Sequence, residues 1–475
     1  MKKTLLKKKT LGLAVFTAAV LVALAPKYFV IGDSAHNNMS YKDTRVMDKI
    51  IKFENTIVQA GISSIDEFGA IGDGVADDTV ALTKALNSGK KVFLKDKGKY
   101  RITKRITVDS KNVFLVCDGK AEIIFDFDDI GFLTTVKPQK TTKAVSENLS
   151  VGKDSIILED IDGIEKGDII CISSKEPWYY DPRPNESESY DTLKGEIHYV
   201  KEIKDNKLIL EGKINDSYKD EVNVTIYKPY SYNIENISFK YSKPTYKTMV
   251  SINFMYKPTI KNSNFANSTA RALYISKCVE AYIDNNTFIG NCPKDVKTGY
   301  GVQDYGSIYS QISNNTFNNF RRGIDFSGNI PSRFGIATNN KVYSISNDGS
   351  FASDWSGIGT HGGAENITIE NNKVVGTDIA YLSRGTNITI RNNSAERISK
   401  FYVKTAFGGV VNILNNTFEG NKNSIIPVNF LRIDVTQRDD SIINVKGNTC
   451  IIKGDFIRND SKANNIHTAN NKISK

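Results

Sequence analysis

Two aspartates and a histidine in the C-terminal half of the chain have the residue types for acid–base chemistry: Asp304, Asp325 and His361. Neighbouring carboxylates push their pKa values apart, so that one can hold a proton as general acid while the other acts as base or nucleophile. The histidine could orient a carboxylate, transfer a proton or bind substrate. Glycines surround it in the segment from Trp355 to Gly363 and would leave room for a ligand. Such a set is typical of a site that hydrolyses glycosidic bonds.

Charged and aromatic side chains outside this trio are candidates for substrate binding. Arg322 and Arg384 could clamp a carboxylate, sulfate or phosphate through paired hydrogen bonds. A lyase would instead use Lys, Tyr, His or Arg as base on a uronate, and these side chains are present too. Rings in the loop 177–183 could stack on sugar faces or pack that loop against the rest of the protein. The candidates are Arg322, Asp354, Tyr381, Arg384, Lys404, Trp178 and Tyr179.

A pair of asparagines followed by an apolar or aromatic side chain recurs through the same half of the chain. The interval of roughly 21 to 32 residues is typical of a solenoid. Asparagine tolerates the left-handed backbone conformation of a tight corner, and stacked asparagines can bond from coil to coil. Compositional bias is the alternative, but it does not explain why each pair follows an alternating strand. The pairs begin at Asn285, Asn314, Asn339, Asn371, Asn392, Asn415 and Asn470, and Gly447-Asn448 is a variant.

Short β-branched runs precede these pairs, such as Ile367-Thr368-Ile369 and Ile388-Thr389-Ile390. They alternate apolar and polar residues as half-buried strands do. One coil cannot bury its own apolar face, whereas coils stacked about 4.8 Å apart bury a continuous core. The pattern therefore predicts an all-β fold, a single-stranded parallel β-helix.

Stacking would also bring the three acid–base candidates together. Counting back eight residues from the first asparagine of each pair puts Gly306 and Gly363 in equivalent places, so that Asp304 matches His361. Alternation on the intervening strand turns Ile324 and Phe326 inward and Asp325 outward. The expected result is a row of three neighbours at roughly one or two strand spacings. If the alignment between coils slipped by one residue, each of these side chains would turn to the other face of the sheet. The alternative to a catalytic site is that the aspartates and the histidine belong to an ordinary solvated surface.

A glycine-rich segment from Ile65 to Thr79 precedes an amphipathic stretch. The glycines permit tight turns, and Asp77 or Asp78 can cap a helix that ends at Gly89. Such a helix would close one end of the solenoid, where unpaired strand edges would otherwise invite aggregation.

The stretch from Phe68 to Thr79 resembles the first motif of the pectate-lyase-like superfamily of right-handed parallel β-helices, which includes phage tailspikes and enzymes related to the polygalacturonases. The resemblance extends from roughly Ile65 to the C-terminus. It implies a right-handed β-helix. Because members include hydrolases, lyases, epimerases and non-catalytic binders, it leaves the reaction open.

Between about Thr141 and Pro229 the asparagine period disappears, and short apolar runs joined by turns predict a small β-rich insertion. We therefore expect five segments. These are a secretory signal or membrane anchor at 1–35, a lead-in at 36–64, the start of the β-helix with its capping helix at 65–140, the insertion at 141–229, and β-helix coils at 230–475.

The N-terminus has the layout of a secretory signal. Lysines at positions 2, 3, 7, 8 and 9 precede an apolar run of about 15 residues with small residues near Ala23 and Ala25. This run is short for a membrane span of roughly 20 residues. We expect a secreted or cell-surface protein without stable membrane association once the signal is cleaved, and an uncleaved anchor is the alternative.

Composition narrows the partners. The formal charge of +10 includes five signal-segment lysines, and the remaining positive excess is compatible with an acidic polymer. Nucleic-acid, zinc and phosphate-loop motifs are absent from the sequence, and five sparse cysteines do not form a disulfide framework. No cofactor is expected, although groove aspartates could hold Ca²⁺, and homo-oligomerisation is left open.

These observations predict an enzyme that cleaves glycosidic bonds of an extracellular or cell-surface polysaccharide by acid–base catalysis in a β-helix groove. Two alternatives stay open. One is a polysaccharide lyase or C5 epimerase acting on uronate polymers. The other is a non-catalytic glycan-binding surface module.

Overall fold

The structure is a computed structural model that describes residues 61–144, 149–181, 191–219, 222–293, 296, 298–344, 355–420 and 427–475. All of these residues fall in one compact unit that runs from residue 57 to the C-terminus. The expected secretory signal, most of the lead-in and Asp354 lie outside the described residues. Among the helices of the described part, none is long and apolar enough to cross a membrane.

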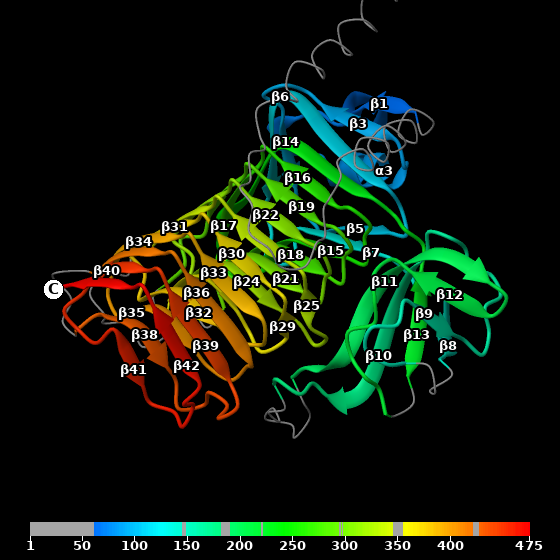
Figure 1. The fold of residues 1–475 in the computed structure, drawn as a ribbon. Coiled ribbons are helices and arrows are strands. Elements are labelled where there is room, and N and C mark those ends of the chain that lie inside the picture. The colour runs from blue at the N-terminus through cyan, green and yellow to red at the C-terminus, as the bar shows by residue number, and fades with distance from the viewer. Residues whose placement is uncertain are drawn as a thin grey trace, which may run out of the picture. The chain divides into compact units, whose positions relative to one another are not determined.

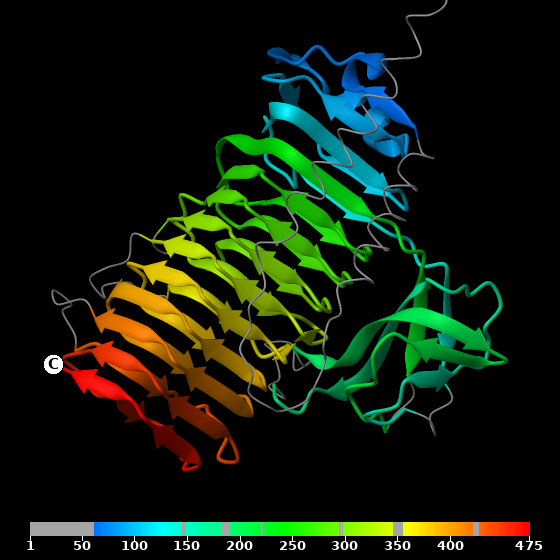
Figure 2. The same cartoon turned by 45° about the horizontal axis from the view of Figure 1, so that its top comes forward.

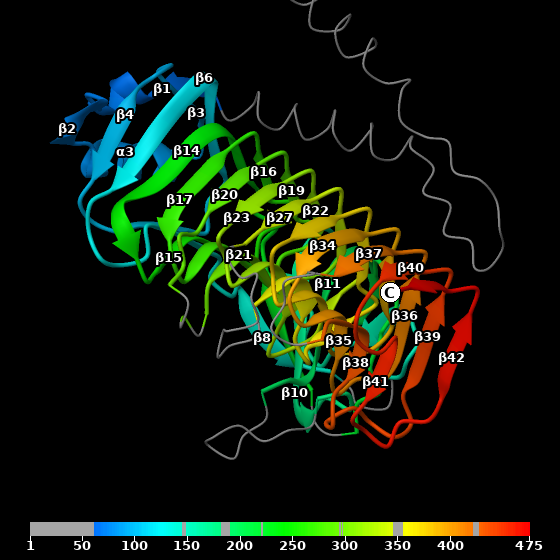
Figure 3. The same cartoon turned by 90° about the vertical axis from the view of Figure 1, so that its left-hand side faces the viewer.

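The described chain winds into a parallel β-helix in which each full coil contributes three strands, as Figures 1 and 3 show. In one coil these are β19 (Tyr282–Asp284), β20 (Thr287–Ile289) and β21 (Tyr300–Tyr305), each paired in parallel with the matching strand of the next coil. The predicted right-handed single-stranded β-helix is thereby confirmed.

The first two strands of each coil belong to a 24-stranded sheet. Besides β19 and β20, its members are β1 (Ile62–Ser64), β2 (Asp73–Asp77), β3 (Lys91–Leu94), β4 (Lys99–Ile102), β6 (Val113–Phe125), β14 (Tyr232–Thr245), β16 (Thr259–Lys261), β17 (Asn264–Ser268), β22 (Gln311–Ser313), β23 (Thr316–Asn318), β26 (Ile336–Thr338), β27 (Lys341–Tyr343), β30 (Thr368–Glu370), β31 (Lys373–Val375), β33 (Ile388–Arg391), β34 (Ser394–Ile398), β36 (Val410–Leu414), β37 (Thr417–Gly420), β39 (Ile442–Lys446), β40 (Thr449–Ile451), β42 (Ile466–Ala469) and β43 (Lys472–Ser474).

The third strand of each coil belongs to an 11-stranded sheet, and this sheet carries the candidate site. Besides β21, its members are β5 (Ile106–Asp109), β7 (Phe132–Thr135), β15 (Thr248–Asn253), β18 (Arg271–Ser276), β24 (Arg322–Ser327), β28 (Ser356–Thr360), β32 (Ile379–Ser383), β35 (Phe401–Thr405), β38 (Asn429–Ile433) and β41 (Ile457–Asn459). A two-stranded sheet of β25 (Ser332–Arg333) and β29 (Ala364–Glu365) lies in the turns that follow β24 and β28.

The asparagine pairs form the corner between the first and second strands. The first residue of each pair has a left-handed backbone, as in Asn371 with a φ of 56°. In the pairs before the last, the second asparagine is buried and its side chain bonds to the next coil: Asn340 Nδ2 donates to Asn372 Oδ1 at 3.0 Å, and Asn372 Nδ2 donates to Asn393 Oδ1 at 3.1 Å. The ladder therefore satisfies buried polar groups that the corner would otherwise leave without partners.

Behind the corner, apolar side chains at equivalent positions stack inside the coils. The rings of Phe265, Phe288 and Phe317 lie 4.8 Å apart from centroid to centroid. This spacing equals the distance between strands, so each coil covers the apolar face of the one before it. The five cysteines are buried thiols without disulfides, as small core residues would be.

The N-terminal end is covered by a short helix. The 3₁₀ turn η1 (Ile65–Phe68) leads to β2, and α3 (Thr79–Asn87) follows with Leu82 and Leu86 buried. Asp78 precedes α3, and its carboxylate accepts hydrogen bonds from the backbone N–H groups of residues 71 and 72 at 2.7 and 3.1 Å. The predicted capping helix is thus present at this end (Figure 1).

A six-stranded antiparallel sheet interrupts the winding between β7 and β14, and Figure 2 shows it beside the coils. It has its own apolar core, which includes Ile170, Val200 and Val224. Its strands are β8 (Lys140–Lys143), β9 (Ser155–Ile157), β10 (Ile169–Pro177), β11 (Leu193–Lys204), β12 (Lys207–Leu210) and β13 (Asn223–Tyr227). We refer to residues 140–227 as the insertion.

Candidate active site

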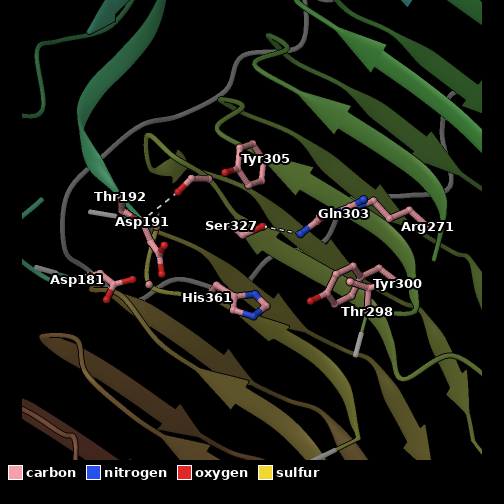
Figure 4. A pocket seen from close by; sticks show the side chains of 13 residues that line it. Asp181, Asp191, Thr192, Arg271, Thr298, Tyr300, Gln303, Tyr305, Ser327 and His361 are labelled. Carbon is pink, nitrogen blue, oxygen red and sulfur yellow. Dashed lines mark hydrogen bonds between the residues drawn. The ribbon is translucent and has the colours of Figure 1, made fainter. Parts of the chain in front are cut away.

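A pocket of about 230 Å³ lies between the insertion and the outward face of the 11-stranded sheet, as Figure 4 shows. The sheet supplies its floor, and Asp181, Asp191 and Thr192 of the insertion supply one wall. The lining residues are Asp181, Asp191, Thr192, Arg271, Thr298, Tyr300, Gln303, Tyr305, Ser327, Gly328, His361, Gly362 and Gly363.

His361 is the predicted catalytic residue that lines this pocket. It follows β28, and 31% of its side chain is exposed. Its Nδ1 lies 2.8 Å from Asp325 Oδ1 and 3.0 Å from Oδ2. Asp325 is fully buried in β24 beneath the pocket floor. The structure therefore brings two of the three predicted catalytic residues into direct contact.

Arg322 completes a buried cluster with this pair. Its Nη1 forms an ion pair with Asp325 and lies 3.1 Å from His361 Nδ1, and its Nε donates to Ser356 Oγ at 2.7 Å. Only 1% of Arg322 is exposed, and its guanidinium is engaged by protein groups. We expected Arg322 to clamp an anion on the substrate, whereas the structure places it behind the histidine.

The positive charges in this cluster keep the Asp325 carboxylate ionised. Burial alone would raise the pKa of Asp325, but the positive charges of His361 and Arg322 hold it well below its usual range. Asp325 is consequently ionised and accepts the proton on His361 Nδ1. This bond fixes the ring orientation and directs Nε2 to the remaining exposed surface, which is the pocket.

Burial lowers the pKa of His361 from its ordinary value, and the Asp325 carboxylate opposes this shift only in part. A histidine with a lowered pKa loses its proton more readily, so its imidazolium is a stronger acid. The pair can therefore deliver a proton from Nε2 to a bound leaving group while Asp325 stabilises the charged ring.

Asp304 does not join this pair, and here the expected register was wrong by one residue. Gln303 pairs with Asp325, whereas Asp304 pairs with Phe326 of the core row. The Asp304 carboxylate is buried inside the β-helix, where it accepts a hydrogen bond from Ser332 Oγ at 2.8 Å. The turn between strands varies in length from coil to coil. Counting back a fixed number of residues from the asparagines therefore gave the wrong alignment for Asp304.

Gln303 takes the place in the row where we expected the aspartate. Its Nε2 donates to Asp325 Oδ2 and to Ser327 Oγ, both at 3.1 Å, and its Oε1 accepts from Arg271 Nε. Tyr300 lies edge-on to the His361 ring, with 6.2 Å between centroids. Strand alternation applied with the observed register would have found Gln303, since it precedes Asp304 in the sequence.

Three of the substrate-binding candidates lie elsewhere. Tyr381 was expected to continue the groove, but it pairs with Ile358 in the core row and is fully buried. Lys404 is on the outward row of the sheet, where its Nζ lies 3.4 Å from Asp434 Oδ2. Arg384 is partly exposed, with its guanidinium 5.6 Å from the centre of the Phe407 ring. None of these side chains lines the pocket described above.

Both aromatic candidates of the insertion contact other protein groups, and neither lines the pocket. Trp178 is 2% exposed and packs edge-on against Tyr180, so it serves packing. Tyr179 is 53% exposed, and the Arg438 guanidinium lies 4.1 Å from its ring centre. Its hydroxyl donates to Asp440 Oδ2 at 3.0 Å. Tyr179 thus ties the insertion to the turn after β38, outside the pocket.

Sequence reasoning missed the pocket residues that the insertion provides: Asp181, Asp191 and Thr192. Their positions depend on how the insertion docks onto the coils, and no periodic pattern encodes that docking.

Burial, together with the neighbouring Tyr274 and Asp191, raises the pKa of the pocket residue Tyr305 to about 12. Within the described ranges, no three His, Cys, Asp or Glu side chains are grouped as ligands for a metal ion.

Comparisons with known proteins agree with this architecture. Residues 222–395 match the family described as right-handed β-helix region. The tailspike gp61 of Pseudomonas phage phi297 superposes with a TM-score of 0.72 at 16% identity, covering 87% of this chain and 75% of that one. The gp54 tailspike of Acinetobacter baumannii bacteriophage AP22, solved in complex with capsular saccharide, gives 0.56 at 13% identity, covering 94% and 82%.

The chain therefore has the right-handed parallel β-helix fold that the resemblance of its glycine-rich motif implied. Among curated proteins it is similar to the pre-neck appendage protein of Bacillus phage B103, with 22% identity over 385 residues. That match covers 79% of this chain, but the chain spans only 39% of the phage protein.

Proposed function

We propose that this protein binds a polysaccharide in the pocket beneath the insertion and hydrolyses its glycosidic bonds with His361 as general acid. The observation that carries the proposal is the His361 imidazole, which is held at Nδ1 by a fully buried aspartate and lines a pocket of about 230 Å³. An exposed histidine of an ordinary surface would have no buried carboxylate to fix its orientation.

In the proposed step, His361 Nε2 gives its proton to the glycosidic oxygen as the bond from that oxygen to C1 of the sugar breaks. The Asp325 carboxylate stabilises the imidazolium through the Nδ1–H bond of 2.8 Å, and Arg322 keeps that carboxylate ionised. General acid catalysis of this kind contributes typically 10² to 10⁴ in rate. Asp325 acts through the histidine and is a positioning residue.

Similar proteins support a polysaccharide as the ligand. The AP22 tailspike, which shares the fold, was solved with a capsular saccharide. The N-terminal pattern of the sequence supports a secreted or cell-surface location, which remains part of this proposal.

The test is incubation of the purified protein with a panel of capsular, pectic and cell-wall polysaccharides, followed by an assay of new reducing ends. We expect release by the wild type and a loss of about 10² to 10⁴ in kcat for His361→Ala. His467→Ala is the matched control, because His467 is an exposed histidine on β42. Wild-type activity with an undiminished His361→Ala variant would refute the assigned role.

A glycan-binding appendage without catalysis is the second candidate, and the similarity to the phage pre-neck appendage protein favours it. It predicts saturable binding of one polymer without any product. The same panel also detects β-elimination, because a lyase would give an unsaturated uronate that absorbs in the ultraviolet and no hydrolytic product.

A further inference from the structure

The insertion places a carboxylate in the pocket that the sequence analysis did not single out. Asp191 lies two residues before β11, is exposed and lines the pocket together with His361. Figure 4 shows it on the insertion side, with His361 on the strand side. The two groups therefore line the pocket from different parts of the fold.

The backbone beside Asp191 is fixed to the coils. Thr192 Oγ1 donates to the carbonyl oxygen of Gly328 at 3.1 Å, and Leu193 N donates to the carbonyl oxygen of Asn329 at 2.8 Å. Both acceptors lie in the turn after β24, the strand that carries Asp325. The turn after β24 thus fixes the insertion wall of the pocket relative to the strand that carries Asp325.

A buried arginine holds the rest of the insertion in place. Arg333 of β25 donates through Nη1 to the carbonyl oxygen of Gly195, and it pairs with Asp216 Oδ2 and Glu365 Oε2, all at 2.7 Å. Arg333 is 2% exposed, so these charge-assisted bonds are shielded from solvent. Such anchoring keeps a catalytic group within the narrow range of positions that chemistry requires.

The second carboxylate of this wall has a different environment. Asp181 is 2% exposed and lies against the backbone of Gly362, where an added Cβ would come within 1.6 Å of its Oδ2. Asp181 therefore packs the insertion onto the glycine that follows His361. Asp191, in contrast, is exposed and lines the pocket.

We propose that Asp191 is the general base of the hydrolysis and activates a water molecule on the face of the sugar opposite the leaving group. This inference rests on the proposed function. The Asp191 carboxylate takes one proton from water as the water oxygen bonds to C1, while His361 Nε2 protonates the departing oxygen, which keeps the electron pair of the broken bond. Proton exchange with solvent restores both groups. The configuration at C1 is inverted.

The test compares the wild type with Asp191→Asn on a polymer that the wild type cleaves. We expect kcat to fall by about 10² to 10⁴ with KM changed by less than about threefold, because the amide keeps the shape of the side chain but cannot accept the proton. Asp154→Asn is the matched control, since Asp154 is an exposed aspartate of the insertion outside the pocket. Unchanged thermal unfolding of Asp191→Asn establishes that the fold is intact.

NMR of the first-formed product supplies a second readout. Inversion of the anomeric configuration supports a base, whereas retention would make Asp191 a nucleophile and overturn the assignment. Undiminished kcat in Asp191→Asn, or a change confined to KM, would also overturn it while leaving the proposed function intact. A wild type inactive on every polymer would instead refute the proposed function itself.

Discussion

Replacing Asn372 with alanine tests the physical basis of the fold. The Asn372 side chain is 1% exposed and makes five hydrogen bonds. Its Oδ1 accepts from the backbone N–H and the Nδ2 of Asn340 at 2.9 and 3.0 Å. Its Nδ2 shares its two hydrogens among three acceptors, the carbonyl oxygens of Ala337 and Glu370, both at 2.9 Å, and Asn393 Oδ1 at 3.1 Å. The alanine variant removes all five bonds.

The expected loss follows from the groups left without partners. The Asn340 backbone N–H has its bond only to Asn372 in this corner, and burying such a donor unsatisfied costs about 1 to 3 kcal/mol. The Nδ2 of Asn340 keeps its bond to the Ile312 carbonyl oxygen at 2.9 Å but loses its second acceptor. Adding the lost donations of Asn372 itself, we expect a decrease of about 3 to 5 kcal/mol in the free energy of unfolding.

The adjacent residue provides the matched control. Asn371 is exposed and has a φ of 56°, so Asn371→Gly keeps the corner conformation and should change stability by no more than about 0.5 kcal/mol. Urea unfolding followed by circular dichroism measures both variants. A loss below about 1 kcal/mol for Asn372→Ala, or equal losses for the two variants, would refute the role assigned to the ladder.

Three further predictions concern titratable groups. The rate of hydrolysis should decline as pH rises through the pKa of His361, because the imidazolium is the proton donor and burial places its pKa below the ordinary 6.5. A rate that rises with pH in this range would contradict the role of His361 as general acid. Burial alone would raise the pKa of Glu196, but hydrogen bonding from His198 and the charge of Arg333 lower it from 4.5 to about 2. The ionised Glu196 carboxylate therefore stabilises the fold above pH 4.5, and this stabilisation is lost as pH falls toward 2. In Glu196→Gln, the free energy of unfolding should fall less steeply between pH 4.5 and 2 than in the wild type, and an equal fall in both proteins would argue against this role. Burial raises the pKa of Asp304 from its usual 3.8, so the stability that this carboxyl contributes at low pH is lost as pH rises. In thermal unfolding, Asp304→Asn should therefore gain stability relative to the wild type as pH rises above 3.8, and a difference that does not change with pH would exclude the effect.

The repeat was readable from the sequence because its physical cause is local. The left-handed corner of Asn371 and the buried amide of Asn372 need only their own coil and the next one. Each further asparagine pair meets the same need for a left-handed corner residue followed by a buried amide. The parallel β-helix could therefore be predicted from the period of these pairs. The outward turn of Asp325 between Ile324 and Phe326 was equally local, since alternation along one strand decides it.

Register between coils was not local. Whether Gln303 or Asp304 lies beside Asp325 depends on the length of the turns between strands, and a change of one residue exchanges the pocket face for the core. The same reason placed Tyr381 inside the coils rather than on the groove.

Residue types and the short-range pattern determined by themselves that this chain stacks coils and that an aspartate and a histidine on its third strands could meet. Only the tertiary structure decided that Arg322 would stand behind them and that Asp191 would face them from the insertion. Contacts such as that of Arg333 with Asp216 join residues that lie 117 positions apart, and these depend on how two separately cored parts of the chain dock. Docking of this kind leaves no repeat in the sequence.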